Sequence, residues 1–132
     1  METWSLNDLE VRPGSPEIVA STDDARAIVI DLPAGESLDD HEVHESAWLV
    51  VLAGEIEVTA LASSKAFSGG VGTFVRFDPA ERHRVDATSD ARFLLLLTPW
   101  PGPGHPGTLS LEEKARVRER AAERADRSGP PS

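Results

Sequence analysis

Three of the four histidines fall in an arrangement that can bind a metal ion or act on a substrate. His41 and His44 come just before an apolar run of strand length, and His83 follows a Gly-rich loop and a second short run. Neutral imidazole is the commonest metal ligand in proteins, and two or three imidazoles with a carboxylate form an open divalent-metal site. The carboxylates nearest to these histidines in the sequence are Asp39, Asp40, Glu42, Glu45 and Glu81.

The elements that would carry these residues are short apolar runs separated by turn signals, a spacing typical of an all-β sandwich or barrel. The run 47–53 is continuously apolar, so we expect it to be buried on both faces. Phe74 and Phe77 are predicted core residues, and Trp48 is predicted to lie in the core or in a dimer interface. The predicted strands cover residues 17–20, 26–32, 47–53, 55–60, 73–77, 83–87 and 92–98.

The chain divides into a barrel over residues 1–98 and a C-terminal part of different character. Residues 99–109 are rich in Pro and Gly and predict a linker, because proline cannot continue a strand ladder. A Ser and a Glu at capping-box spacing predict that a helix follows over residues 110–127. Residues 128–132 are predicted to be a disordered tail.

Charge and composition exclude several classes of function. The formal net charge is −10, and residues 111–132 hold six basic and five acidic side chains, so the rest of the chain carries −11. A body this acidic repels phosphate backbones and anionic membranes, and we expect neither partner. The chain has no cysteine, no secretory leader pattern and no apolar run that could span a bilayer, so we expect a cytoplasmic protein.

Two segments resemble the paired motifs of the cupin family. The first motif is Gly, five residues, His-x-His, three or four residues, Glu, six residues, Gly, and Gly35, His41 and Gly54 match its spacing. The second is Gly, five residues, Pro-x-Gly, two residues, His, three residues, Asn. Gly72 and His83 match its span, with the proline displaced by one position. The resemblance implies an all-β cupin jelly-roll β-barrel, here with a C-terminal α-helix, that forms a homodimer.

The sequence departs from the cupin motifs at two ligand positions, where Val43 and Ala47 replace the second histidine and the glutamate. The asparagine of the second motif is replaced by Ala87. Histidines three residues apart point to opposite faces of a regular strand, and a bulge or loop is needed to bring both to one face. The candidate ligands for a divalent ion (Fe, Mn, Ni or Zn) are His41, His44, Glu45 and His83.

Three hypotheses about function remain open, and the sequence leaves open whether the protein is an enzyme and which residues would be catalytic. The first is a protein that binds a small molecule in the barrel pocket with no or weak metal binding. The second is a divalent-metal-dependent enzyme of dioxygenase or isomerase type, which uses His41, His83 and either His44 or Glu45. The third is a module whose acidic barrel and charged helix dock a partner protein. The missing ligands favour the first, with a pocket lined by His41, His83, Leu49 and Val51.

Overall fold

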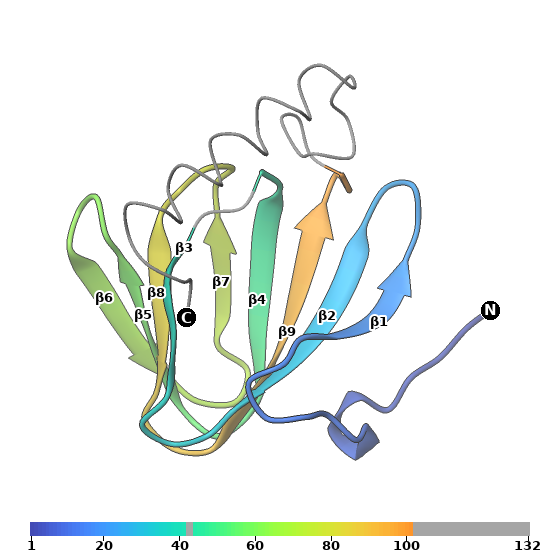
Figure 1. Cartoon of the computed structure of the whole chain (residues 1–132), viewed down its shortest axis with the longest axis horizontal. Helices are drawn as coiled ribbons and strands as arrows, with labels where there is room; N and C mark the ends of the chain where they lie inside the picture. The colour runs from blue at the N-terminus through green and yellow to red at the C-terminus, as the bar shows by residue number, and fades with distance from the viewer. Residues whose placement is uncertain (42–43, 102–132) are drawn as a thin grey trace, which may run out of the picture.

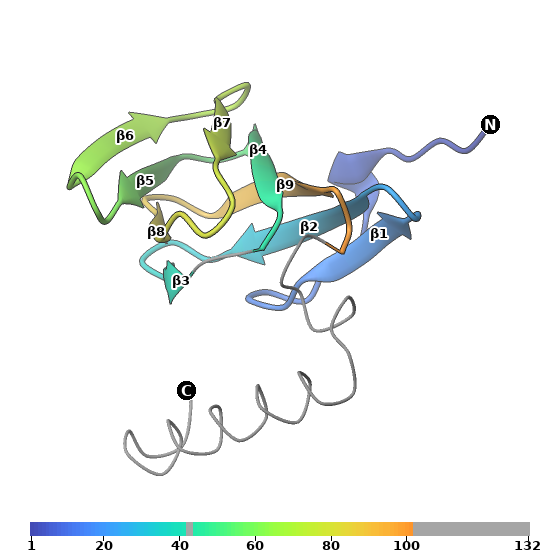
Figure 2. The same cartoon turned by 90° about the horizontal axis from the view of Figure 1, so that it is seen from above.

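The computed structural model describes residues 1–41 and 44–101, with the backbone alone for residues 39–41. In this described part, two antiparallel sheets face each other, preceded by a single turn of 3-10 helix (Figure 1, Figure 2). The elements are η1 (Leu6–Asp8), β1 (Glu17–Ser21), β2 (Arg26–Leu32), β3 (Ser37–His41), β4 (Ser46–Ala53), β5 (Ile56–Ala60), β6 (Lys65–Gly69), β7 (Phe74–Phe77), β8 (His83–Ala87) and β9 (Ala91–Thr98).

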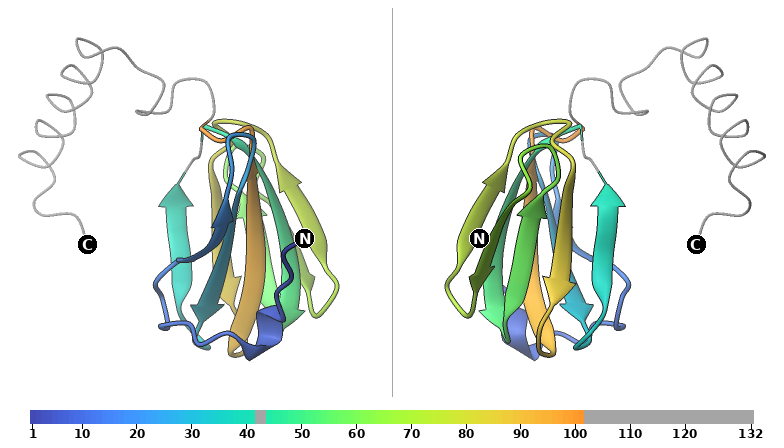
Figure 3. Two further views of the ribbon diagram at one scale, coloured as in Figure 1. Left: turned by 90° about the vertical axis from the view of Figure 1, so that its right-hand side faces the viewer. Right: turned by 90° about the vertical axis from the view of Figure 1, so that its left-hand side faces the viewer.

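The two sheets together enclose one core. The larger sheet has the strand order β1-β2-β9-β4-β7, and the smaller has the order β3-β8-β5-β6. Figure 3 views the sheets from their sides, where they form two layers. Consecutive strands often belong to different sheets, so the chain crosses repeatedly between the layers. The result is the all-β jelly-roll architecture that the sequence predicts.

Strand alternation builds the core between the sheets. In β4, Ala47, Leu49 and Val51 are buried, and the residues between them are only partly buried. The prediction that this run is buried on both faces is therefore wrong, because the sheet packs against its partner on one side only. Phe77 lies in the core as predicted, whereas Phe74, also predicted to be core, is 64% exposed on the outward side of the edge strand β7.

Two strands were not predicted, and both form the margins of the smaller sheet. β3 has the sequence Ser-Leu-Asp-Asp-His, and β6 has an almost wholly exposed burial pattern. Neither strand shows alternating apolar residues. An edge strand forms hydrogen bonds with one neighbouring strand only, and it can do so without burying one side of itself completely. The predicted helix and tail, and the linker beyond residue 101, lie outside the described residues. Within the described part, no helix has the length and apolarity needed to cross a membrane.

Candidate functional site

The strand registers bring several segments to one end of the barrel, which we call the His83 end. His41 of β3 stands directly opposite His83 of β8, and Ala60 of β5 stands opposite His83 on its other side. In the larger sheet, Ala47 at the start of β4 pairs with Phe77 at the end of β7. The end of β3, the start of β4 and the connection from β7 to β8 therefore lie at the same end, which is the top of Figure 1.

His83 is held in a fixed orientation inside this end. Its side chain shares the inward parity of Val85 and Ala87, and the residue is only 2% exposed. The ring stacks on Phe77 with a centroid distance of 3.8 Å and an interplanar angle of 10°. Nδ1 lies 3.0 Å from the carbonyl oxygen of Glu81. Because a carbonyl oxygen can only accept, Nδ1 carries the hydrogen and donates it.

Glu45 is a buried carboxylate at the same end. It directly precedes β4 and is 2% exposed, whereas its neighbour His44 is exposed. Burying a carboxylate costs several kcal/mol unless hydrogen bonds or charges compensate, about 2–7 kcal/mol even for a neutral polar group. Every buried side-chain nitrogen or oxygen of the described residues has a hydrogen-bond partner. Glu45 is therefore a satisfied, structurally fixed group.

The predicted site residues thus differ in their burial and position. His83 and Glu45 are buried at the His83 end, and His44 is exposed. The side chain of His41 lies outside the described part, although its backbone pairs with that of His83. Leu49 and Val51, predicted to line the pocket, lie in the buried core at 0% and 1% exposure.

The donor atoms of the described residues do not fit the four-ligand metal centre that the cupin motifs imply. At the glutamate position Ala47 is 2% exposed on the inner face and offers only a methyl group. Val43, at the second histidine position, has no donor atom in its side chain. Among side chains of residues 1–38 and 44–101, no three histidines or carboxylates are grouped so that they could hold a metal ion.

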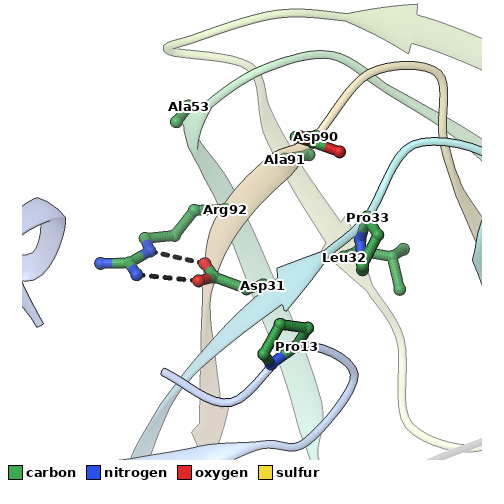
Figure 4. Close-up of a pocket in the computed structure, with 8 residues that line it drawn as sticks. All are labelled: Pro13, Asp31, Leu32, Pro33, Ala53, Asp90, Ala91 and Arg92. Atoms are coloured by element: carbon green, nitrogen blue, oxygen red, sulfur yellow. Dashed lines mark hydrogen bonds and ion pairs between the residues drawn. The ribbon is translucent and has the colours of Figure 1, made fainter. Parts of the chain in front are cut away.

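A pocket of about 360 Å³ lies at the opposite end of the barrel (Figure 4). Arg92 there donates two hydrogen bonds to Asp31, with distances of 2.6 and 2.8 Å, and a third of 2.8 Å to the carbonyl oxygen of Leu6. The hydrogen bond with Asp31 raises the pKa of Arg92 above its usual value. The pocket is lined by Pro13, Asp31, Leu32, Pro33, Ala53, Asp90, Ala91 and Arg92.

This second pocket was not predicted from the sequence. Alternation along each strand places Asp31 and Arg92 on the outer face. That they face each other depends on the register between β2 and β9. Asp90 also serves the scaffold, because its Oδ1 accepts a hydrogen bond of 2.8 Å from the backbone of Ala34. These interactions tie the N-terminal segment and the adjacent turns to the sheet, so we assign this end a structural role.

Comparison with known proteins shows the family. The profile of the family described as "Cupin domain" matches residues 28–99. Among proteins with curated functions, a search finds no match to this sequence. An RmlC-like cupin protein from Desulfovibrio desulfuricans superposes with a TM-score of 0.67 at 22% identity, over 75% of this chain and 97% of that chain.

Other solved structures share the fold at similarly low identity. A conserved protein from Klebsiella pneumoniae with a double-stranded β-helix domain gives a TM-score of 0.66 at 18% identity, over 77% of this chain and 93% of that one. The DMSP lyase DddQ from Ruegeria pomeroyi gives 0.56 at 22% identity, over 64% of this chain and 41% of that one. At these identities the likeness concerns the fold alone, and the family profile carries the assignment. The chain belongs to the cupin domain family.

Proposed function

We propose that this protein binds a small organic molecule at the His83 end of the barrel, without the four-ligand metal centre of the cupin motifs. The observation that carries the proposal is the fixed orientation of His83. Its ring is buried, stacked on Phe77 and anchored through Nδ1 by the carbonyl of Glu81. Such an imidazole loses little entropy when a ligand binds, because its position is already set.

The chemistry of the described residues indicates the class of ligand. A neutral imidazole that donates from Nδ1 offers a ligand an acceptor at Nε2, and a carboxylate group offers acceptor oxygens. The inner residues near them, Phe77, Ala47 and Leu97, are apolar and buried. A mostly apolar wall with a few acceptor groups suits a small, largely apolar molecule that carries a hydroxyl or an amino group.

His41 is included in the proposed site on the strength of its register. The backbone of position 41 pairs with that of position 83, which brings the two residues together at this end. The exposure of His44 supports leaving it out.

A divalent-metal-dependent enzyme is the alternative function. One specific observation favours it, namely that a buried imidazole and a buried carboxylate, His83 and Glu45, occupy the same end of the barrel. With His41 they would supply three donors, the smallest set for a catalytic centre with an open position. The replacement of two motif ligands by Val43 and Ala47 makes this the second choice.

Two measurements on the untagged protein decide between these functions. We would record ring-proton NMR signals of His83 while adding a panel of small aromatic and aliphatic alcohols and amines, together with hydrocarbons of the same shape. We expect alcohols or amines to shift the signals more than the hydrocarbons do. His83→Ala should weaken binding of the best compound about tenfold, the loss of one hydrogen bond worth about 1.4 kcal/mol.

Arg84→Ala is the matched control, because Arg84 is the next residue of β8 and points to the opposite, exposed side. It should leave the affinity unchanged. In parallel, metal per chain is measured by mass spectrometry before and after dialysis against a chelator. Near-stoichiometric metal that resists dialysis and disappears in His83→Ala would establish the alternative. Equal affinity of His83→Ala and the unmodified protein, or no binding by any compound, would overturn the proposal.

A further inference from the structure

The arginines of the described strands differ in the face of the sheet that they occupy. Arg76, Arg84 and Arg92 alternate with buried residues, so they lie on outer faces, and each of them pairs with an aspartate. Arg26 begins β2 and has the inward parity of Ile28, which packs against the core. Within the described part, no carboxylate forms an ion pair with Arg26. An inward guanidinium without an acidic partner is suited to bind an anion.

The strand registers place Arg26 in one row with the residues around His83. Arg26 stands opposite Leu97. Leu97 in turn stands opposite Ala47, which stands opposite Phe77. Directly opposed residues share a face of the sheet, so this row lies on the inner face, and its last three members belong to the core. Phe77 carries the stacked ring of His83. Arg26 therefore lies at the His83 end, and Figure 2, which looks onto this end, shows β2 and β8 in the two opposing sheets.

The guanidinium of Arg26 is held in place at this end. Its carbon lies 4.0 Å from the ring centroid of Trp100, and Nε donates a hydrogen bond of 3.3 Å to Oγ of Ser21. Trp100 packs against the core cluster, and its backbone N–H donates a hydrogen bond of 3.1 Å to the carbonyl oxygen of Asp24. The ring covers one flat face of the guanidinium, and Ser21 takes only Nε. The N–H groups of the two terminal nitrogens form a fork that matches a carboxylate.

We infer that Arg26, supported by Trp100, is an anion subsite of the ligand site at the His83 end, so that the ligand is a small organic acid with a hydroxyl or amino group at its other end. The inference deepens the proposed function and rests on it. The two sides of the site are complementary, because Arg26 only donates hydrogen bonds, whereas His83 and Glu45 offer acceptors. A molecule with a carboxylate at one end and a donor at the other is bound in one direction.

The spacing of the strands limits the length of this ligand. The backbones of Arg26 and Phe77 are three strands apart, which is at most about 14 Å at a spacing of about 4.8 Å. The side chain of Arg26 and the ring of His83 both reach inward and shorten this span. Leu97 and Ala47, between them, are apolar and suit a hydrocarbon middle. Medium-length hydroxy or amino acids, acyclic or with one aromatic ring, meet these requirements.

The test compares acids with their uncharged amides on the untagged full-length protein. We would titrate 6-hydroxyhexanoate and 4-(hydroxymethyl)benzoate, each beside its primary amide, and follow the ring-proton NMR signals of His83. Each acid should bind about tenfold more tightly than its amide, because hydrogen bonds between charged partners are the stronger ones. Arg26→Gln should remove this preference and leave the affinity for the amides unchanged. His83→Ala should weaken acid and amide alike and keep their ratio.

Arg76→Gln is the matched control, because it removes the same charge from the outer face at the same end of the barrel. It should keep the preference for acids, and circular dichroism verifies that the variants are folded. Equal affinity for acid and amide in the unmodified protein overturns the anion subsite. So does an acid preference that survives Arg26→Gln, or a variant that loses acid and amide equally. In each case, binding that depends on His83 would leave the proposed function intact. Binding that ignores His83→Ala, or no binding by any compound, overturns both.

Discussion

The two ends of the barrel use polar side chains in opposite ways. At the His83 end, an imidazole and a carboxylate are buried, and the imidazole lies on the inner face of its sheet. At the other end, Asp31 and Arg92 lie on the outer face and bind each other and the N-terminal segment. The pocket that Figure 4 shows is therefore lined by groups that hold the scaffold together. The pocket of this molecule and its candidate functional site therefore lie at opposite ends of the barrel.

The difference arises from the alternation of side chains along two strands. His83 alternates with exposed Arg84 and so shares the core face with Val85. Arg92 alternates with Phe93, which is fully buried, so Arg92 must point outward. A shift of one residue in either strand would exchange these faces completely. Substitutions at the two ends test this difference.

The largest effect is expected from Gly54→Ala, at the end of the barrel opposite to the His83 end. Gly54 has a φ of 72°, and a Cβ built there would lie 2.0 Å from the backbone oxygen of Asp90. Backbone strain and the clash with backbone atoms together should lower the free energy of unfolding by about 3–5 kcal/mol. Urea denaturation measures the change. Gly35→Ala, at a φ of 84° but with nothing within 4 Å, isolates the strain and should cost only about 1 kcal/mol.

The second effect concerns the ion pair that defines this end. Arg92→Ala leaves the carboxylate of Asp31 without the two hydrogen bonds from the guanidinium, in a pair where Arg92 is only 14% and Asp31 26% exposed. We expect the free energy of unfolding to fall by about 2–3 kcal/mol, with small-molecule binding at the His83 end unchanged. Arg84→Ala, which removes the more exposed pair with Asp86, should cost less than about 1 kcal/mol. Equal losses for the two variants would contradict a special structural role for the Asp31–Arg92 pair.

The smallest effect is expected from Phe77→Leu at the His83 end. The change removes the ring that stacks on His83 and should cost about 1 kcal/mol of stability. Its informative readout is NMR, because the ring protons of His83 should lose the shift that a stacked aromatic ring causes. Phe93→Leu changes an equally buried core ring elsewhere and should leave the His83 signals in place. If both variants leave these signals unchanged, Phe77 does not orient His83.

Much of the fold follows from local pattern. The strand 26–32 coincides with β2, and 83–87 coincides with β8, because each combines an apolar alternation with turn residues at its ends. Within the site, the burial of His83 follows from its parity with Val85 and Ala87. The edge strands β3 and β6 could not be predicted in this way, because their ladders depend on neighbours distant in the sequence.

The candidate site, too, could be predicted from the sequence only in part. The spacing of His41 and His83 suggested that they belong together, and only the pairing of β3 with β8 places their backbones opposite each other. Glu45 and His44 are adjacent in the sequence and equally eligible as ligands, yet one is buried and the other exposed. Alternation along a strand predicts that these neighbours point to opposite sides. The tertiary structure decided which of the two is buried.

The family, the strand-rich core and the loss of two metal-ligand side chains could all be inferred from the sequence, because they depend on residue type and on a periodicity of two residues. The tertiary structure alone decided which sheet face each aromatic and charged side chain occupies relative to the rest of the molecule. Phe74 shows this most clearly. Its residue type predicts a place in the core, yet its position on the outer face of an edge strand leaves it exposed to solvent. The physical reason is that register and layer packing couple residues many positions apart, which no local pattern records.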